Sequence, residues 1–242
     1  MKCKNAFLKL LIVSFITIFI TSSYLIMKNF LQFKESEKAT RELIEEVIEN
    51  EEKTEKQIVN WKQLTSRNSD IIGWIKIDGT KINYPILQDN NNLFYIKHDY
   101  NKKYNPSGSI FTINENPFKD DETIIYGHNM LNGSMFSNLD RYLTDSFLYS
   151  HLSIKIYTKT KNYDGKIFSV YSTGVIDEIN NIKNLSFSEK IEYYKEASKY
   201  TIDNIDENIS KIVKLSTCSY INAKSINTDQ RYYIIASITP DD

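Results

Sequence analysis

The sequence predicts a mostly β protein, with a closed or nearly closed barrel of about eight strands after a single transmembrane helix and a helical extension. Two observations predict this fold. From residue 71 onward, short segments rich in β-branched and aromatic residues alternate with turn sequences, which is typical of barrels. Near the N-terminus, residues 10–27 contain no charged residue, no Pro and no Gly. The 242 residues suit one domain with an appendage.

Residues 1–28 are the predicted cytoplasmic tip and membrane anchor. The apolar run 10–27 reaches the lower length limit of a transmembrane helix, and Phe7 and Leu8 extend it past Lys9. Three lysines precede the run, which favours a cytoplasmic N-terminus and places the rest of the chain outside the membrane. A cleaved signal peptide is the alternative. The return of apolar residues at 24–27 favours an uncleaved anchor.

Composition and charge exclude several classes of protein. The chain has 30 Lys and Arg against 31 Asp and Glu, so it offers no general basic surface for nucleic acid. Its first 28 residues hold four lysines and no acid, which leaves 26 basic against 31 acidic residues elsewhere. Two cysteines exclude a disulfide scaffold and a cysteine-based zinc site. With no metal-spaced His and Asp cluster in the sequence, we expect neither a metal nor a cofactor.

Residues 29–68 are predicted to form a helical stalk, and residues 69–242 the barrel domain. One apolar stripe at 43–48 and another through Ile58, Trp61 and Leu64 predict helix over 35–68. The charge run at 50–56 is interpreted as a solvated face or as a break between two helices. We expect Trp61 to pack this region on the domain.

Eight strands and two further helices are predicted in the barrel domain. Asp78-Gly79 suits a two-residue hairpin turn, and Pro85 indicates an edge or a bulge. One helix is predicted over 134–144. The other covers 187–203 and begins with a capping box formed by Ser186 and Glu189. The predicted strands are 71–77, 80–86, 109–114, 123–127, 153–158, 166–176, 211–218 and 231–238.

The exported part of the chain contains one cysteine, Cys218, because Cys3 lies on the cytoplasmic side of the predicted anchor. An unpaired thiol in an exported protein is a candidate reactive group. A buried cysteine that packs as a small hydrophobic residue is the alternative. The number of cysteines alone does not separate these two interpretations.

Three residues at predicted strand ends suggest a catalytic site. His128 follows a strand and Gly127, Cys218 ends a strand, and Arg231 begins the next one. Antiparallel pairing of these last two strands brings Cys218 beside Arg231. Histidine can take the thiol proton, and arginine can stabilise a developing oxyanion. Cys, His and Arg on one rim predict acyl transfer, whereas His98 and His151 are expected to be surface or structural residues.

At these residues the sequence resembles the sortase family, and within it class B. The matching pieces are TIIYGHNM around His128, KLSTC ending at Cys218 and RYYIIASI starting at Arg231. The resemblance covers residues 60–242 and implies a sortase-type barrel with a helix between its sixth and seventh strands. It implies a membrane-anchored cysteine transpeptidase of Gram-positive bacteria, without a cofactor. Such an enzyme cleaves the sorting motif of secreted proteins after Thr and transfers them to an amine of the peptidoglycan precursor.

The resemblance also implies roles for individual residues. Cys218 would carry the thioester, His128 would be the general acid and base, and Arg231 would position the substrate and stabilise the oxyanion. Ser216 and Thr217 would line the groove next to the thiol. Asn92 and Ile96 match positions that hold the early residues of the sorting motif.

Three departures from the family pattern accompany these assignments, one of them a loop between Cys218 and Arg231 that is somewhat long for class B. The family often has a second histidine after the catalytic one, where this chain has Asn129. An acidic residue near the site has no clear equivalent, and Asp229 is a candidate by its proximity to Arg231 only.

Two other functions remain open at this point. A membrane-anchored module that binds a peptide without chemistry would use the same groove, but it has no need of a thiol there. A purely hydrolytic cysteine peptidase on the same fold would share the site and differ only in using water as the acceptor.

Overall fold

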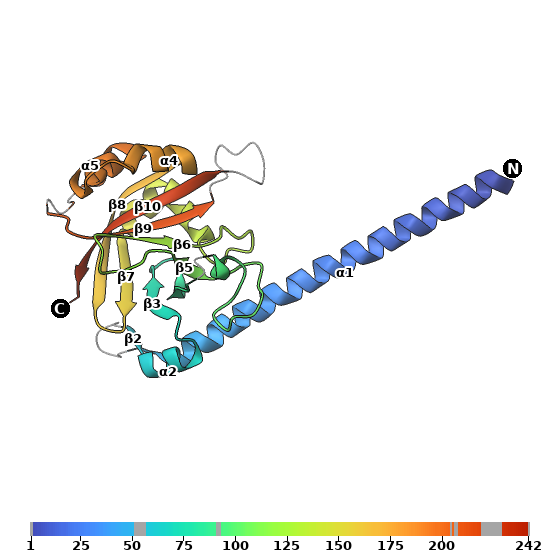
Figure 1. Cartoon of the computed structure of the whole chain (residues 1–242), viewed down its shortest axis with the longest axis horizontal. Coiled ribbons are helices and arrows are strands. Elements are labelled where there is room, and N and C mark those ends of the chain that lie inside the picture. Colours follow the sequence, from blue (N-terminus) through green and yellow to red (C-terminus); the bar gives the residue numbers. More distant parts are fainter. Residues whose placement is uncertain are drawn as a thin grey trace.

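Eight strands close into a barrel in the computed structural model of the chain, which describes residues 2–50, 57–90, 93–203, 205, 208–218 and 229–241. The order around the barrel is β10-β8-β7-β3-β4-β5-β6-β9 (Figure 1). The pairs β4–β5 and β6–β9 are parallel, and the others are antiparallel. This confirms the predicted closed barrel. Its strands are β3 (Ile71–Lys76), β4 (Asn83–Leu87), β5 (Ile110–Thr112), β6 (Glu122–Tyr126), β7 (Ser153–Thr158), β8 (Asn162–Gly174), β9 (Ile212–Cys218) and β10 (Gln230–Pro240).

Alternation along the strands decides which side chains fill the barrel and which face outward. Ile125, Leu215 and Ile234 belong to the interior cluster and are fully buried. Because successive residues of a strand point to opposite faces, Tyr126, Ser216 and Tyr233 face outward from the same three strands. The outer face of β6, β9 and β10 is the one that carries the predicted site.

Helix α1 (Lys2–Val47) runs from the N-terminus to the barrel as one continuous helix (Figure 1). Its last turns are docked, since Leu43 and Val47 are buried in a cluster with Leu64 and Trp74. In the described part of α1, one stretch is long and apolar enough to cross a membrane, and none of it is buried. This is consistent with the predicted anchor.

The predicted helix over 35–68 is confirmed up to Val47 and again from Trp61 to Arg67, but it is wrong at Ile48–Asn50 and Gln57–Val59. Strand β1 (Ile48–Asn50) pairs antiparallel with β2 (Gln57–Val59), and helix α2 (Trp61–Arg67) follows. Ile58 therefore lies in a strand and not on a helical stripe. The hairpin returns the chain so that Val59, like Val47, is buried against the barrel, while Trp61 packs at the margin of the same cluster. Most of the charge run, residues 51–56, lies outside the described residues.

The connection between β3 and β4 is longer than the predicted two-residue turn. Ile77 N–H donates to Ile82 O at 2.9 Å, so four residues span the turn, with Gly79 at φ +74°. Pro85 pairs with Trp74 of β3, and the ladder from β4 to β5 begins only at Ile86. The missing N–H of Pro85 thus falls before this ladder begins.

The predicted helix over 134–144 is a 3₁₀ helix, η2 (Ser137–Leu143), and a short helix α3 (Asp145–Ser150) follows it. Leu139 and Tyr142 of η2 are fully buried in the barrel cluster. A second 3₁₀ turn, η1 (Phe94–Ile96), lies between β4 and β5. The apolar spacing predicted a helical segment here, but it does not distinguish 3₁₀ from α geometry.

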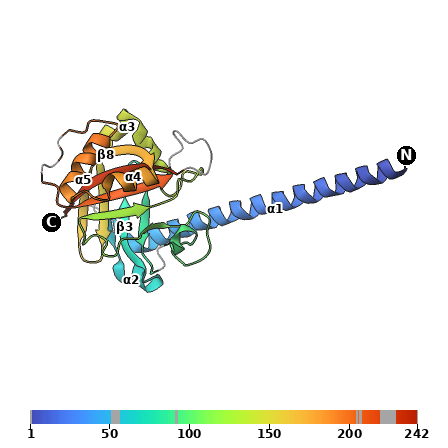
Figure 2. The same ribbon diagram turned by 45° about the horizontal axis from the view of Figure 1, so that its top comes forward.

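Two helices cover the outer face of β8, β9 and β10 (Figure 2). They are α4 (Val175–Ile182) and α5 (Phe187–Ala197), and they connect the sixth barrel strand to the seventh, as predicted. The capping box is confirmed, because Ser186 N–H donates to Glu189 at 2.8 Å and Ser186 Oγ accepts from Glu189 N–H. The helix ends at Ala197 and not at 203. Val175 and Ile176, predicted as the end of a strand, begin α4 instead.

Candidate active site

Three strand ends meet at one rim of the barrel. Arg231 is the register partner of Cys218 across β10 and β9, which confirms the predicted antiparallel pairing. On the other side of β9, Tyr126 of β6 is the parallel partner of Ser216. His128 follows Tyr126 by two residues, and Cys218 follows Ser216 by two residues. Because Tyr126 and Ser216 are register partners, we expect His128 and Cys218 at the same height along the rim. Alternation places the side chains of Cys218 and Arg231 on the outer face of β9 and β10, and His128 lies two residues beyond the end of β6.

The imidazole of His128 is oriented by a backbone carbonyl. Its Nε2 lies 2.9 Å from the carbonyl oxygen of Ile96 in η1. A carbonyl oxygen only accepts hydrogen bonds, so Nε2 carries the hydrogen and donates it. In the neutral ring this leaves Nδ1 as the basic nitrogen, which is the state that a general base requires.

The carbonyl of Ile96 is held in turn by a tight backbone contact. Ser109 N–H donates to Tyr95 O at 2.9 Å, next to Gly108 at φ +56°. A Cβ on Gly108 would lie 2.4 Å from the Ile96 oxygen, closer than any real contact. Gly108 is therefore required both by its positive φ and by this close approach.

Cys218 and Arg231 are both half-buried at the rim. Cys218 forms no disulfide among the described residues. Arg231 Nη1 donates to Gln230 O at 3.0 Å, and Ser172 Oγ donates to Arg231 O at 2.9 Å. Burial raises the pKa of the neighbouring Tyr126, while the positive charge of Arg231 opposes the rise. The positive charge of Arg231 therefore reaches the outward-facing side chain of Tyr126 on β6.

An apolar groove of about 300 Å³ begins at this rim. Its floor is the outer face of β6, β9 and β10, including Ser216 and Arg231. One side is formed by Leu93 and Ile96, and the other by α4 through Ile179 and Ile182. A mostly apolar groove that leads to a few polar groups is the usual form of a binding site. Another cavity, of about 340 Å³, lies between α1 and the barrel and contains none of the predicted site residues.

The residues predicted to bind substrate are placed differently from one another. Ser216 and Ile96 line the groove. Thr217 points away from it, because its side chain is 2% exposed and its hydroxyl lies inside the barrel without a partner among the described residues. Asn92 lies outside the described residues. Asp229 is exposed, and its carbonyl accepts from Val175 N–H at 3.1 Å.

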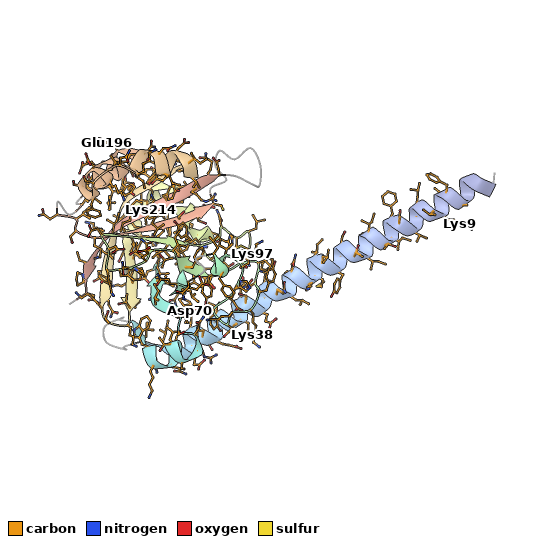
Figure 3. All side chains as sticks on the ribbon, viewed as in Figure 1. Lys9, Lys38, Asp70, Lys97, Glu196 and Lys214 are labelled. Carbon is orange, nitrogen blue, oxygen red and sulfur yellow. The ribbon has the colours of Figure 1, made fainter. Side chains whose placement is uncertain are left out.

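A buried ion pair at the floor of the groove was not predicted from the sequence. Lys214 of β9 pairs with Glu178 of α4, and their side chains are only 2% and 4% exposed. Glu178 also accepts from the hydroxyls of Tyr171 at 2.7 Å and Tyr193 at 3.1 Å. Figure 3 labels Lys214 on the barrel, below the two helices α4 and α5. The alternation of side chains along β9 could have indicated this position, because Lys214 faces outward like Ser216 and Cys218.

A second ionic group extends this network along β6. Tyr194 OH donates to Glu122 at 2.8 Å, and Lys190 pairs with the same carboxylate at 3.0 Å. Lys214 Nζ lies 3.4 Å from the Tyr194 hydroxyl and over the ring of Tyr233. Burial lowers the pKa of Lys214, and Glu178 opposes this effect. The network joins α4 and α5 to the strands that carry the rim.

The arrangement is suited to nucleophilic acyl transfer. A thiol, an imidazole whose Nε2 is bonded to a backbone carbonyl, and a guanidinium lie at adjacent strand ends beside a groove. A thiol and a base on one rim form the nucleophile pair, and the guanidinium supplies donors for an oxyanion. Among the described residues, no cluster of three or more His, Cys, Asp and Glu side chains is arranged to hold a metal ion.

Comparisons with known proteins point to one family. Residues 75–239 match the family model of the sortase domain. Sortase B of Listeria monocytogenes is 38% identical over 162 residues, which cover 65% of this chain and 66% of the relative. Sortase B of Staphylococcus aureus is 29% identical over 239 residues, 96% of each chain. The structure of Bacillus anthracis sortase B in complex with AAEK1 has a TM-score of 0.71 and 31% identity, covering 88% of this chain and all of that one.

Proposed function

The chain belongs to the sortase family, with its similarities in class B, and on this basis we propose that it anchors secreted proteins to the cell wall as a membrane-bound transpeptidase. The proposed substrate is a sorting motif that is cleaved after Thr, and the proposed acceptor is an amine of the peptidoglycan precursor. The N-terminus is proposed to be cytoplasmic and the barrel extracellular. The observation that carries the proposal is the register of Arg231 with Cys218, next to the end of β6, which His128 follows by two residues.

The first half of the reaction forms a thioester. His128 Nδ1 accepts the proton of the Cys218 thiol, and the sulfur attacks the carbonyl carbon of the Thr residue. Arg231 stabilises the negative charge that develops on the carbonyl oxygen. The C–N bond of the scissile peptide then breaks, and the His128 imidazolium gives its proton to the leaving amine.

The second half transfers the acyl group. The amine of the acceptor attacks the thioester carbon, His128 takes one of its protons, and the C–S bond breaks as the new amide forms. The thiolate of Cys218 is restored. Ile96 and Ser216 are proposed to contact the sorting motif in the groove, and Asn92 keeps its proposed role beside Ile96. Thr217, inside the barrel, is proposed to support the position of Cys218 and not to touch the substrate.

Incubation of the full chain with a panel of sorting peptides tests the proposal. We expect cleavage after Thr, an acyl adduct on Cys218 detected by mass spectrometry, and loss of both in Cys218→Ala. The matched control is Cys3→Ala, which removes the other cysteine and is expected to leave the rate unchanged. Cleavage by Cys218→Ala would overturn the proposal.

The acceptor separates the two remaining alternatives. With an added amine, the transpeptidase forms the amide product at the expense of the free acid. Only free acid under both conditions would identify a hydrolytic peptidase. Peptide binding that is unchanged in Cys218→Ala, together with no cleavage by the native chain, would identify a binding module.

A further inference from the structure

The hydrogen-bond ladder between β6 and β9 ends in an unusual way beside the proposed nucleophile. Gly127 N–H donates to Ser216 O at 3.2 Å. In a regular parallel ladder the next bond would join Asn129 N–H to Cys218 O. Instead the side-chain Nδ2 of Asn129 donates to Cys218 O at 3.0 Å. The backbone of Asn129 forms a bridge with Met135 and closes the loop 129–135.

The amide of Asn129 is held in a single orientation. The same Nδ2 lies 3.1 Å and 3.3 Å from the two carboxylate oxygens of Asp140. A carbonyl and a carboxylate only accept, and the amide NH₂ has two hydrogens, so one hydrogen goes to each partner. The bond to the carboxylate is charge-assisted and is the stronger type. A rotated amide would place an oxygen against both acceptors.

Asp140 is itself exposed, but the residues on either side of it are held by the barrel. It lies in η2, where the adjacent Leu139 and nearby Tyr142 are fully buried in the barrel. Phe136, which directly precedes η2, donates its N–H to His128 O at 2.9 Å and is also fully buried. The segment 136–140 is thus bonded to the main chain of His128 on one side and, through Asn129, to that of Cys218 on the other.

We propose that Asn129 and Asp140 are positioning residues that fix the backbone of Cys218 relative to His128. The inference rests on the proposed roles of Cys218 and His128 in catalysis. Asn129 spans the rim where β6 and β9 no longer bond through their backbones, and Asp140 keeps the Asn129 amide directed at the Cys218 carbonyl. Neither residue touches the substrate, so both act through the geometry of the thiol and the imidazole.

The first test is the kinetics of peptide cleavage by the full chain in detergent. A displacement of about 1 Å between reacting groups can lower a rate by about 100-fold. We expect Asn129→Ala to lower kcat by roughly 10- to 100-fold and to leave KM within about twofold, because the groove is intact. Asp140→Asn retains an acceptor for the amide and is expected to stay near the native rate. Asp140→Ala removes that acceptor and is expected to lower kcat.

Asn132→Ala is the matched control in the same loop. Asn132 Oδ1 accepts from Ser134 N–H and Oγ at 3.1 Å and 2.7 Å, and its Nδ2 donates to Glu37 at 3.2 Å. Asn132→Ala removes as many side-chain hydrogen bonds as Asn129→Ala does, but none of them goes to Cys218. We expect a native kcat. An equal loss in both variants would show that loop integrity matters and not the bond to Cys218, and would overturn the proposal.

The second test does not depend on cleavage. The rate of alkylation of Cys218 by iodoacetamide, followed against pH and resolved from Cys3 by mass spectrometry, reports how much thiolate the histidine stabilises. We expect the curve of Asn129→Ala to move to higher pH and that of Asn132→Ala to stay in place. An unmoved curve together with native kcat would overturn the proposal.

The two tests also separate this proposal from the proposed function. A shifted alkylation curve in a chain that cleaves no sorting peptide would leave the positioning role standing and refute the transpeptidase. Normal cleavage by Asn129→Ala would refute the positioning role and leave the transpeptidase standing. A kcat for Asp140→Asn as low as that of Asp140→Ala would show that the charge acts on the site directly and would overturn the assignment for Asp140.

Discussion

Replacing Glu178 with glutamine removes the charge that neutralises Lys214 beneath helix α4. Both side chains are nearly inaccessible, at 4% and 2% exposed, so solvent cannot screen the remaining ammonium group. Loss of one partner of a buried ion pair typically costs about 3–5 kcal/mol. For a chain of this size that corresponds to a Tm lower by roughly 6–20 °C.

The matched control is Glu192→Gln, the same substitution in an exposed pair on the neighbouring helix. Glu192 lies 2.8 Å from Lys195, and the carboxyl side chain is 67% exposed. We expect the free energy of unfolding of Glu192→Gln to differ from that of the native chain by less than about 0.5 kcal/mol. Thermal unfolding of the full chain in detergent, followed by circular dichroism, compares both variants with the native chain. A loss of stability in Glu178→Gln that is no larger than in Glu192→Gln would refute the reasoning.

The pH dependence of Glu178→Gln gives an independent check. Burial lowers the pKa of Lys214 in the folded chain. The unfolded chain then binds the proton more tightly, so the free energy of unfolding rises as the pH increases through the folded pKa. Without Glu178 that pKa falls further. The loss of stability in the variant is therefore expected to become smaller as the pH rises towards the ordinary pKa of lysine, and a loss that grows with pH would contradict this account.

Three further predictions concern the rim and the helices. Gly108→Ala places a Cβ against the Ile96 carbonyl that holds His128. We therefore expect a lower Tm in thermal unfolding and a lower kcat in peptide cleavage. A native Tm and a native kcat would show that this carbonyl does not orient the imidazole. Arg231→Ala is expected to lower kcat by about 100-fold or more while the fold survives, and near-normal turnover would remove its assigned role. Ser186→Ala removes the capping box of α5 and is expected to cost about 1 kcal/mol in thermal unfolding, with unchanged stability counting against the cap.

Local sequence signals account for the elements that were predicted well. Each barrel strand overlaps a β-branched or aromatic segment, as in SIKIYT, which is β7 from end to end, although β8 begins at Asn162, four residues before its predicted start. The capping box at Ser186 depends only on residues three apart and was predicted from them. The same local signals misled where a β-branched pair, Val175 and Ile176, begins a helix. There the buried pair of Glu178 with Lys214 holds α4 on the barrel, and this tertiary contact outweighs the strand preference of the two residues.

The hairpin of β1 and β2 shows what periodicity cannot decide. Ile58, Trp61 and Leu64 have helical spacing, but Ile58 lies in a strand. A short apolar run fits either structure, and here the burial of Val47 and Val59 against the barrel decides it. The ion pair of Lys214 and Glu178 was missed for a related reason, since 36 residues separate its partners.

The sequence by itself determined the chemistry available at the site: one cysteine beyond the apolar N-terminal segment, with a histidine and an arginine at strand ends. It also determined the barrel and the apolar N-terminal segment, because both depend on local patterns. Tertiary structure alone decided how the groups are oriented. The Ile96 carbonyl on His128, the Asn129 amide on Cys218 and the charge pair under the groove join residues far apart in the chain, and only closure of the barrel brings them into contact.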